Sequence, residues 1–98
     1  MVEVGQLVEK GRAAMSAREW KLAVKIYQKI LKISSKNASA WSDLGAAYTE
    51  LADVQRAENA LNKALKIDPD LVPALGNLAN LRKQIGKKED AEKLYRWI

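Results

Sequence analysis

The chain has 98 residues, 48% of them apolar and 30% charged, which suits one small domain and is too apolar for a disordered segment. It has no cysteine, which excludes a disulfide scaffold, and no apolar run as long as a membrane span or secretory signal, so we expect a cytoplasmic location. The formal net charge is +5, and most of the excess lies in the first third of the chain.

Apolar residues spaced by three and four positions predict six helices in chain order. The first, near residues 3–16, has the weakest pattern. The second, near residues 19–33, has the clearest, a continuous apolar stripe from Trp20 to Leu31. The remaining four helices are expected near residues 38–51, 54–66, 72–85 and 88–98.

Polar residues and prolines mark the helix boundaries. Residues 34–37 interrupt the apolar pattern, and the side chain of Asn37 is suited to cap the third helix. Pro69 excludes its predecessor from helical backbone angles, whereas Pro73 is tolerated in the first turn of the fifth helix. The breaks near residues 17–19, 52–53 and 86–87 are short, and short links predict antiparallel neighbours.

The apolar pattern repeats along the chain with a period of about 34 residues. Five positions recur at this spacing: Leu7, Trp41 and Leu75; Gly11, Gly45 and Ala79; Ala23, Ala57 and Ala91; Tyr27, Leu61 and Tyr95; Ile30, Ala64 and Ile98. Such a period indicates a solenoid of helix pairs, in which each unit buries its apolar face against its neighbours. Glycine in mid-helix costs ~1 kcal/mol relative to alanine, so its recurrence predicts a close helix crossing faced by the alanines. Chance recurrence of common helix residues is the alternative.

The middle unit carries the fullest pattern. In chain order it contains Trp41, Leu44, Gly45, Tyr48, Ala57, Leu61, Ala64 and Pro69. This pattern resembles the tetratricopeptide repeat. The resemblance implies an all-α, right-handed α-solenoid of three antiparallel helix pairs, forming one domain over residues 1–98. The repeats would lie near residues 4–37, 38–71 and 72–98, the third of them truncated.

The same resemblance implies a scaffold or adaptor that binds a peptide or partner helix in a concave groove. The first helix of each pair would line this groove, with these polar residues as candidate partner contacts: Arg12, Asp43, Thr49, Glu50, Asn77, Asn80, Lys83 and Gln84. Smaller or apolar residues on the same faces are Val8, Met15, Ser39, Ser42, Ala46, Pro73 and Gly76. Asn77 and Asn80 are the leading candidates, because an amide both donates and accepts hydrogen bonds. Exposed polar residues with no binding role are the alternative.

One subclass of the family, the co-chaperones, holds the C-terminal carboxylates of chaperones in a clamp of lysine, asparagine and arginine. The matching positions here are Val8, Arg12, Asp43, Pro73 and Asn77, and none keeps the residue that the clamp uses. Asp43 would also repel a carboxylate. We therefore expect no carboxylate clamp.

A basic stripe on the second helix offers an alternative function. Lys21, Lys25, Lys29 and Lys32 share one face and suit an acidic partner, nucleic acid or a membrane surface. The aromatic residues are expected in the core and not between the lysines, which disfavours nucleic acid. A solvated face is the plainer interpretation.

The last predicted helix is short and apolar, and it offers a second alternative. Leu94, Tyr95, Trp97 and Ile98 lie close together in it. They indicate either a fragment cut from a longer protein or a surface for self-association as a homo-oligomer.

The composition argues against an enzyme. Histidine and cysteine, the commonest general base, nucleophile and zinc ligands, are absent, and no glycine-rich phosphate loop occurs. Asp43 and Glu50 could share a helix face, but holding a basic side chain is the more natural role for them. We expect no cofactor and no metal site.

Overall fold

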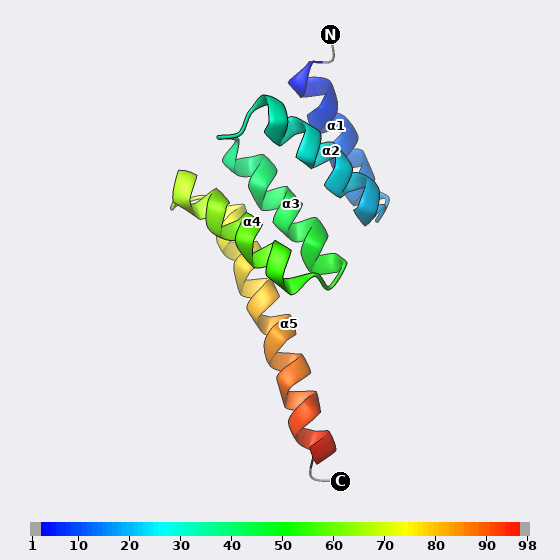
Figure 1. Ribbon diagram of the computed structural model, residues 1–98, viewed down its shortest axis with the longest axis vertical. Helices are drawn as coiled ribbons and strands as arrows, with labels where there is room; N and C mark the ends of the chain where they lie inside the picture. Colours follow the sequence, from blue (N-terminus) through cyan, green and yellow to red (C-terminus); the bar gives the residue numbers. More distant parts are fainter. Residues whose placement is uncertain (1–2, 97–98) are drawn as a thin grey trace.

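The computed structural model describes the backbone of residues 3–96 and the side chains of residues 3–89. It contains five helices: α1 (Val4–Ser16), α2 (Trp20–Ile33), α3 (Ala38–Glu50), α4 (Val54–Ile67) and α5 (Val72–Arg96). Consecutive helices pack against each other, and α3 also packs against α5. In Figure 1, α2 and α4 face the reader, with α1 behind α2 and the first part of α5 behind α4. The predicted all-α helical repeat is confirmed.

The turns inside the first two helix pairs are built alike. Arg18 follows α1 with φ 59°, and Ala52, its equivalent in the next repeat, follows α3 with φ 60°. The N–H groups of Glu19 and Asp53 each donate to the carbonyl five positions earlier, at 2.9 and 3.0 Å. These bonds satisfy carbonyls in the last helical turn, as in a Schellman motif, and they let the chain reverse within a few residues. The first two predicted breaks are therefore confirmed.

Side chains cap the starts of α3 and α4. The side-chain oxygen of Asn37 accepts from the N–H of Ala40 at 3.1 Å, as predicted, and Asp53 accepts from the N–H of Arg56 at 3.2 Å. Each bond satisfies a backbone donor that has no partner within its own helix.

Gly11 and Gly45 lie at close helix crossings, as their spacing predicts. A Cβ at Gly45 would lie 2.6 Å from Leu61 Cγ and 3.3 Å from the carbonyl oxygen of Ala57. A Cβ at Gly11 would lie 2.9 Å from Tyr27 Cζ, so this crossing is closed by an aromatic ring. The distances to Leu61 and Tyr27 are shorter than carbon atoms in contact normally allow, so any residue larger than glycine requires these side chains or their helices to shift.

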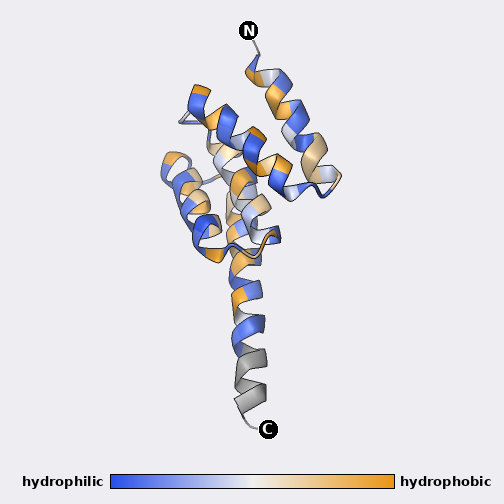
Figure 2. Cartoon of the chain, turned by 45° about the vertical axis from the view of Figure 1, so that its right-hand side comes forward, coloured by the Kyte–Doolittle hydropathy of each residue, from blue (hydrophilic) through white to orange (hydrophobic). Residues whose placement is uncertain are grey.

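The predicted third helix pair is wrong. α5 runs without a break through residues 86 and 87, where the sequence indicates a turn, so two antiparallel pairs are followed by one long helix. The physical reason is local. Lys87 occupies the position that Asp53 has in the preceding repeat and cannot accept a capping bond, but α2 also starts without such a bond at Glu19, so the missing cap alone does not explain the difference. The residues on both sides of Gly86 are good helix formers, which favours a continuous helix. The coloured turns of α5 already run on beyond the other helices (Figure 2).

This continuous helix leaves part of the repeat pattern unburied. Val72 is 74% exposed and Leu75 is 47% exposed, and Ala79 is exposed as well, although their counterparts in α3 are partly or fully buried. The expected self-association residues Trp97 and Ile98 lie outside the described residues, as do the side chains of Leu94 and Tyr95. Within residues 3–96, no helix has the combination of length and hydropathy that a bilayer span requires.

Candidate functional site

A hollow of about 410 Å³ lies between α1, α3 and the start of α5, and Tyr27 of α2 also lines it. It is lined by Arg12, Met15, Ser16, Tyr27, Ser39, Ser42, Asp43 and Pro73. Its volume is within the range of pockets that hold small ligands or inserted side chains. Six of these residues belong to the groove set expected from the sequence, and they come from all three units of the repeat.

Two charged candidates, Arg12 and Asp43, meet at this hollow beside Tyr27. Burial raises the pKa of Asp43, although the Tyr27 hydroxyl and the Arg12 guanidinium partly oppose that rise. Burial also raises the pKa of Tyr27, and the charge of Asp43 adds to the effect. The Tyr27 hydroxyl has no hydrogen bond of standard geometry among the described residues, yet it lies close enough to Asp43 for each group to shift the other's pKa. The hollow therefore contains a partly buried carboxyl and a buried hydroxyl without a standard hydrogen bond, next to a cation.

Asn77, a leading candidate, is engaged inside the molecule. Its side-chain Nδ2 donates to the hydroxyl of Ser42 at 3.1 Å and lies 3.3 Å from the Ser42 carbonyl oxygen. Ser42 is 1% exposed, so the amide of α5 is tied to the buried surface of α3. The donor side of Asn77 therefore holds two helices together and is already occupied.

The other candidates lie outside the hollow. Thr49 is 4% exposed, and its hydroxyl donates to the carbonyl oxygen of Gly45 at 2.8 Å, so it has no free donor to offer. The remaining four are exposed and continue along α3 and α5 beyond the hollow: Glu50, Asn80, Lys83 and Gln84.

A second and larger groove, which the sequence does not predict, lies on the side of α2 and α4. It has a volume of about 830 Å³, its walls come from α2 and α4, and its floor comes from α3. Trp41 and Tyr48 line it together with lysines of α2. Tyr48 is buried and Trp41 packs against the core, so the predicted core position of these aromatic residues is confirmed. The lysine stripe of α2 was the one feature of the sequence that pointed to this groove. The sequence does not show that α3 places its aromatic side chains beneath that stripe.

Side chains that could ligate a metal ion are not clustered among the residues that the structure describes. Within that part of the chain, no group of three or more histidine, cysteine, aspartate or glutamate side chains is placed to hold a metal ion.

Helix pairs stacked in sequence, with a hollow on one side and a groove on the other, define a helical-repeat scaffold. A tetratricopeptide repeat family model matches residues 14–70, and a second one matches residues 60–93. The chain belongs to the tetratricopeptide repeat family. Members of this family are non-catalytic protein-interaction scaffolds.

Individual relatives resemble almost the whole chain. It is 33% identical over 96 residues to human Superkiller complex protein 3 and 32% identical over 92 residues to Tetratricopeptide repeat protein 37 of Xenopus laevis. These alignments cover 95% and 94% of the chain but only 6% of each relative, so the chain spans a small part of their length. The solved TPR domain of Arabidopsis OM64 is 30% identical, with a TM-score of 0.79, covering 95% of this chain and 77% of that one.

Proposed function

We propose that the chain binds an extended peptide segment of a partner protein along the side formed by α1, α3 and α5. The observation that carries this proposal is the hollow where Arg12 and Asp43 meet with residues from all three helices. A peptide lying across the first helices of successive repeats would contact this hollow and then the exposed side chains farther along α3 and α5.

The chemistry of the lining favours a side chain inserted between apolar walls, with polar contacts to its backbone. Met15 and Pro73 supply apolar surface, and the exposed Arg12 can donate to a peptide carbonyl. Asp43 can accept from a peptide N–H or from a basic side chain, which would restore some of the solvation that burial removes.

Positions on the same helix faces extend this surface. Glu50 lies seven positions after Asp43, and Asn80 lies seven positions after Pro73, which places each pair two turns apart on one face. We assign the extended contact to Glu50, Asn80, Lys83 and Gln84. Asn77 and Thr49 are assigned to the packing beneath it, because their side chains already have partners.

A selection from a random displayed peptide library, followed by calorimetric titration of the enriched peptides, tests the proposal. Ser39 is exposed at the hollow, so Ser39→Arg should fill it and weaken the selected peptides about tenfold, or about 1.4 kcal/mol. The matched control is Asn62→Arg, on an exposed position of α4 that lines neither hollow nor groove, and it should leave affinity unchanged. Equal affinity for wild type and Ser39→Arg, or no enrichment of any sequence, would contradict the proposal.

Three further expectations stay predictions. The division into repeats at residues 4–37, 38–71 and 72–98 is supported by the matching turns at Arg18 and Ala52.

Cell fractionation tests the cytoplasmic location. Light scattering at several concentrations tests self-association through Leu94, Tyr95, Trp97 and Ile98.

A further inference from the structure

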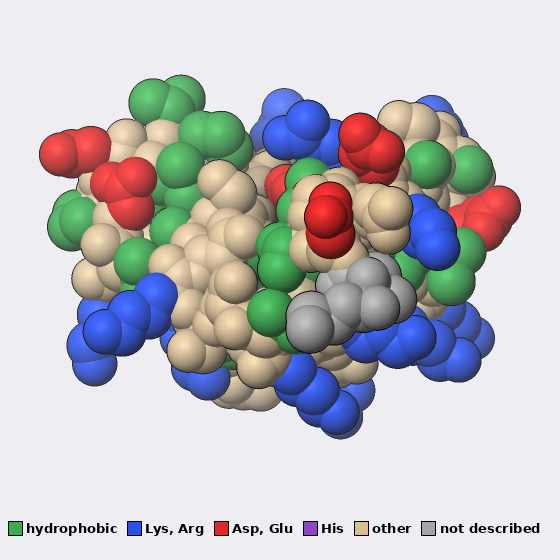
Figure 3. Space-filling model, turned by 90° about the horizontal axis from the view of Figure 1, so that it is seen from above, with side chains coloured by type: hydrophobic (Ala, Val, Ile, Leu, Met, Phe, Trp, Pro, Cys, Tyr) green, Lys and Arg blue, Asp and Glu red, His purple; other side chains and the backbone are tan. Residues whose placement is uncertain are grey.

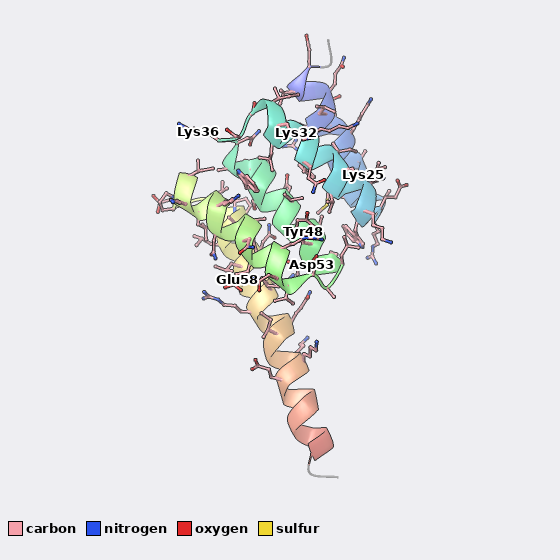
Figure 4. All side chains as sticks on the ribbon, viewed as in Figure 1. Lys25, Lys32, Lys36, Tyr48, Asp53 and Glu58 are labelled. Carbon is pink, nitrogen blue, oxygen red and sulfur yellow. The ribbon has the colours of Figure 1, made fainter. Side chains whose placement is uncertain are left out.

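The groove between α2 and α4 is a larger recess than the hollow of α1, α3 and α5. Both helices pack beside α3, which forms the floor, and the volume between them is about 830 Å³. Figure 4 shows Lys25 and Lys32 along α2, with Tyr48 of α3 between them and α4. The groove lies on the side of α2 and α4, so it does not overlap the hollow of α1, α3 and α5.

The floor and lower walls of this groove are apolar. Leu22 and Ile26 of α2 line one wall, and Leu22 is 45% exposed although it is a large aliphatic side chain. Trp41 and Leu44 of α3 line the floor, and Trp41 is only half-buried. Apolar side chains from a partner would therefore find apolar surface, and a half-buried tryptophan is the kind of residue that anchors protein interfaces.

The rim of the groove is positively charged. Fourteen residues line the groove, and none of them is acidic. Five are basic: Lys25, Lys29, Lys32, Arg56 and Lys63. In Figure 3, lysine and arginine side chains gather along the lower edge, which is the side that faces the reader in Figure 1, and no acidic side chain is visible there. The field over the groove therefore attracts negative charge.

Most of this positive charge is not neutralised by the chain itself. Arg56 pairs with Asp53 at 3.3 Å, and the Lys63 ammonium lies 4.5 Å from the centre of the Trp41 ring. Among the described side chains, no ion pair engages the three lysines of α2, although they repel one another at spacings of three and four positions. An acidic partner would relieve that repulsion.

We propose that this groove binds an acidic amphipathic helix of a partner protein, with apolar side chains on the α3 floor and carboxylates along the lysines of α2. Lys25, Lys29 and Lys32 lie at i, i+4 and i+7, so they follow one helix face at the same rise as acidic residues on a helix laid alongside. Apolar burial provides affinity, and the charges set specificity and association rate.

The lining favours a protein segment over single-stranded nucleic acid. Base stacking requires open aromatic faces, but Tyr48 is 9% exposed and its hydroxyl accepts from Gln28 Nε2 at 3.1 Å. The Lys63 ammonium already covers the ring of Trp41. The rest of the floor is aliphatic, which suits leucine-like side chains better than bases.

Fluorescence anisotropy with a labelled probe peptide tests this inference. The probe is a helix-forming peptide of glutamate and alanine with leucines at i, i+3, i+4 and i+7, and its counterpart has lysine in place of each glutamate. The wild-type chain should bind the acidic probe saturably and not its basic counterpart. Lys25→Glu with Lys29→Glu should weaken binding about tenfold in low salt, and Leu22→Ser should weaken it about threefold.

The matched control carries Lys10→Glu and Lys66→Glu, two exposed positions outside the groove that change net charge equally. Its affinity should stay within about twofold of wild type. Melting curves of every variant establish that it is folded. Absence of saturable binding to wild type, or an equal loss in the control, would overturn the inference. Tighter binding of an oligouridylate than of the acidic probe would also overturn it and would reassign the groove to nucleic acid.

Discussion

At Gly45, two helices approach until the space for a single methyl group disappears. The Cβ that alanine would add lies 2.6 Å from Leu61 Cγ and 2.7 Å from Leu61 Cδ2. Leu61 is fully buried in close-packed surroundings, so a change of its rotamer would disturb other core side chains. The helix therefore accepts the entropy cost of glycine because the packing of α3 on α4 requires it.

Gly45→Ala should destabilise the fold, although alanine is the better helix former. We expect a net loss of roughly 1–3 kcal/mol in the free energy of unfolding, measured by urea denaturation. Gly76→Ala in α5 is the control, because a Cβ there meets nothing within 4 Å, and it should gain up to about 1 kcal/mol. An equal increase in the free energy of unfolding for both substitutions would show that α3 and α4 leave room for a methyl group at Gly45.

Asp43 is predicted to give the stability of the fold a pH dependence. Burial raises the pKa of Asp43 in the folded chain above the unfolded value of about 3.9. The folded state therefore holds this proton more tightly, and the carboxyl lowers stability as pH rises above that unfolded value. Asp43→Asn should raise the melting temperature at neutral pH and change it little below about pH 3, where the carboxyl is protonated in both states.

Thermal melts at the two pH values, with the exposed Asp70→Asn as control, measure this effect. The control should change the melting temperature little at either pH. A lower melting temperature for Asp43→Asn at neutral pH would mean that the attraction to Arg12 outweighs burial.

The sequence predicts on which helix face each candidate site residue lies, but it does not predict which residues its side chain contacts. The repeat period places Arg12, Asp43 and Pro73 on the first helices of successive units, and the structure brings them together at one hollow. The period carries no information about which neighbour a side chain meets in the adjacent repeat. For that reason Asn77 was expected to bind a peptide, whereas its amide is bonded to Ser42.

At the scale of the element, α5 differs from the two helix pairs before it. Arg18, Ala52 and Gly86 occupy equivalent positions, and the first two have the left-handed backbone that reverses the chain. Gly86 would adopt that conformation at no steric cost, yet its φ is not positive and the helix continues through it. A glycine at the equivalent position is therefore insufficient to predict a turn where the residues on both sides of it are good helix formers.

Substitutions at two equivalent positions should therefore follow opposite rules. Gly86→Ala should stabilise the fold by about 0.5–1 kcal/mol, since it lies in a helix with no atom near its added Cβ. Ala52→Gly should also stabilise it, by up to about 1 kcal/mol, because its φ of 60° disfavours a side chain. Circular dichroism and thermal melts measure both. Destabilisation by Gly86→Ala would mean that α5 turns at this residue.

At the scale of the whole molecule, the repeat presents two surfaces of different character. One side has a hollow with mixed charge at α1, α3 and α5, and the other has an apolar groove with a basic rim at α2 and α4. The fold class, the first two turns and the glycine crossings could be predicted from local pattern and period. The second groove could not, because it depends on how α3 fills the space between two helices far apart in sequence.

The central claim is that a partner peptide binds on the side of α1, α3 and α5. Chemical-shift mapping of the ¹⁵N-labelled chain with a peptide from the library selection tests it most directly. We expect the largest shifts at Arg12, Met15, Ser39 and Asp43, with small shifts along α2 and α4. Shifts centred on the lysines of α2, or spread evenly over the chain, would contradict the claim.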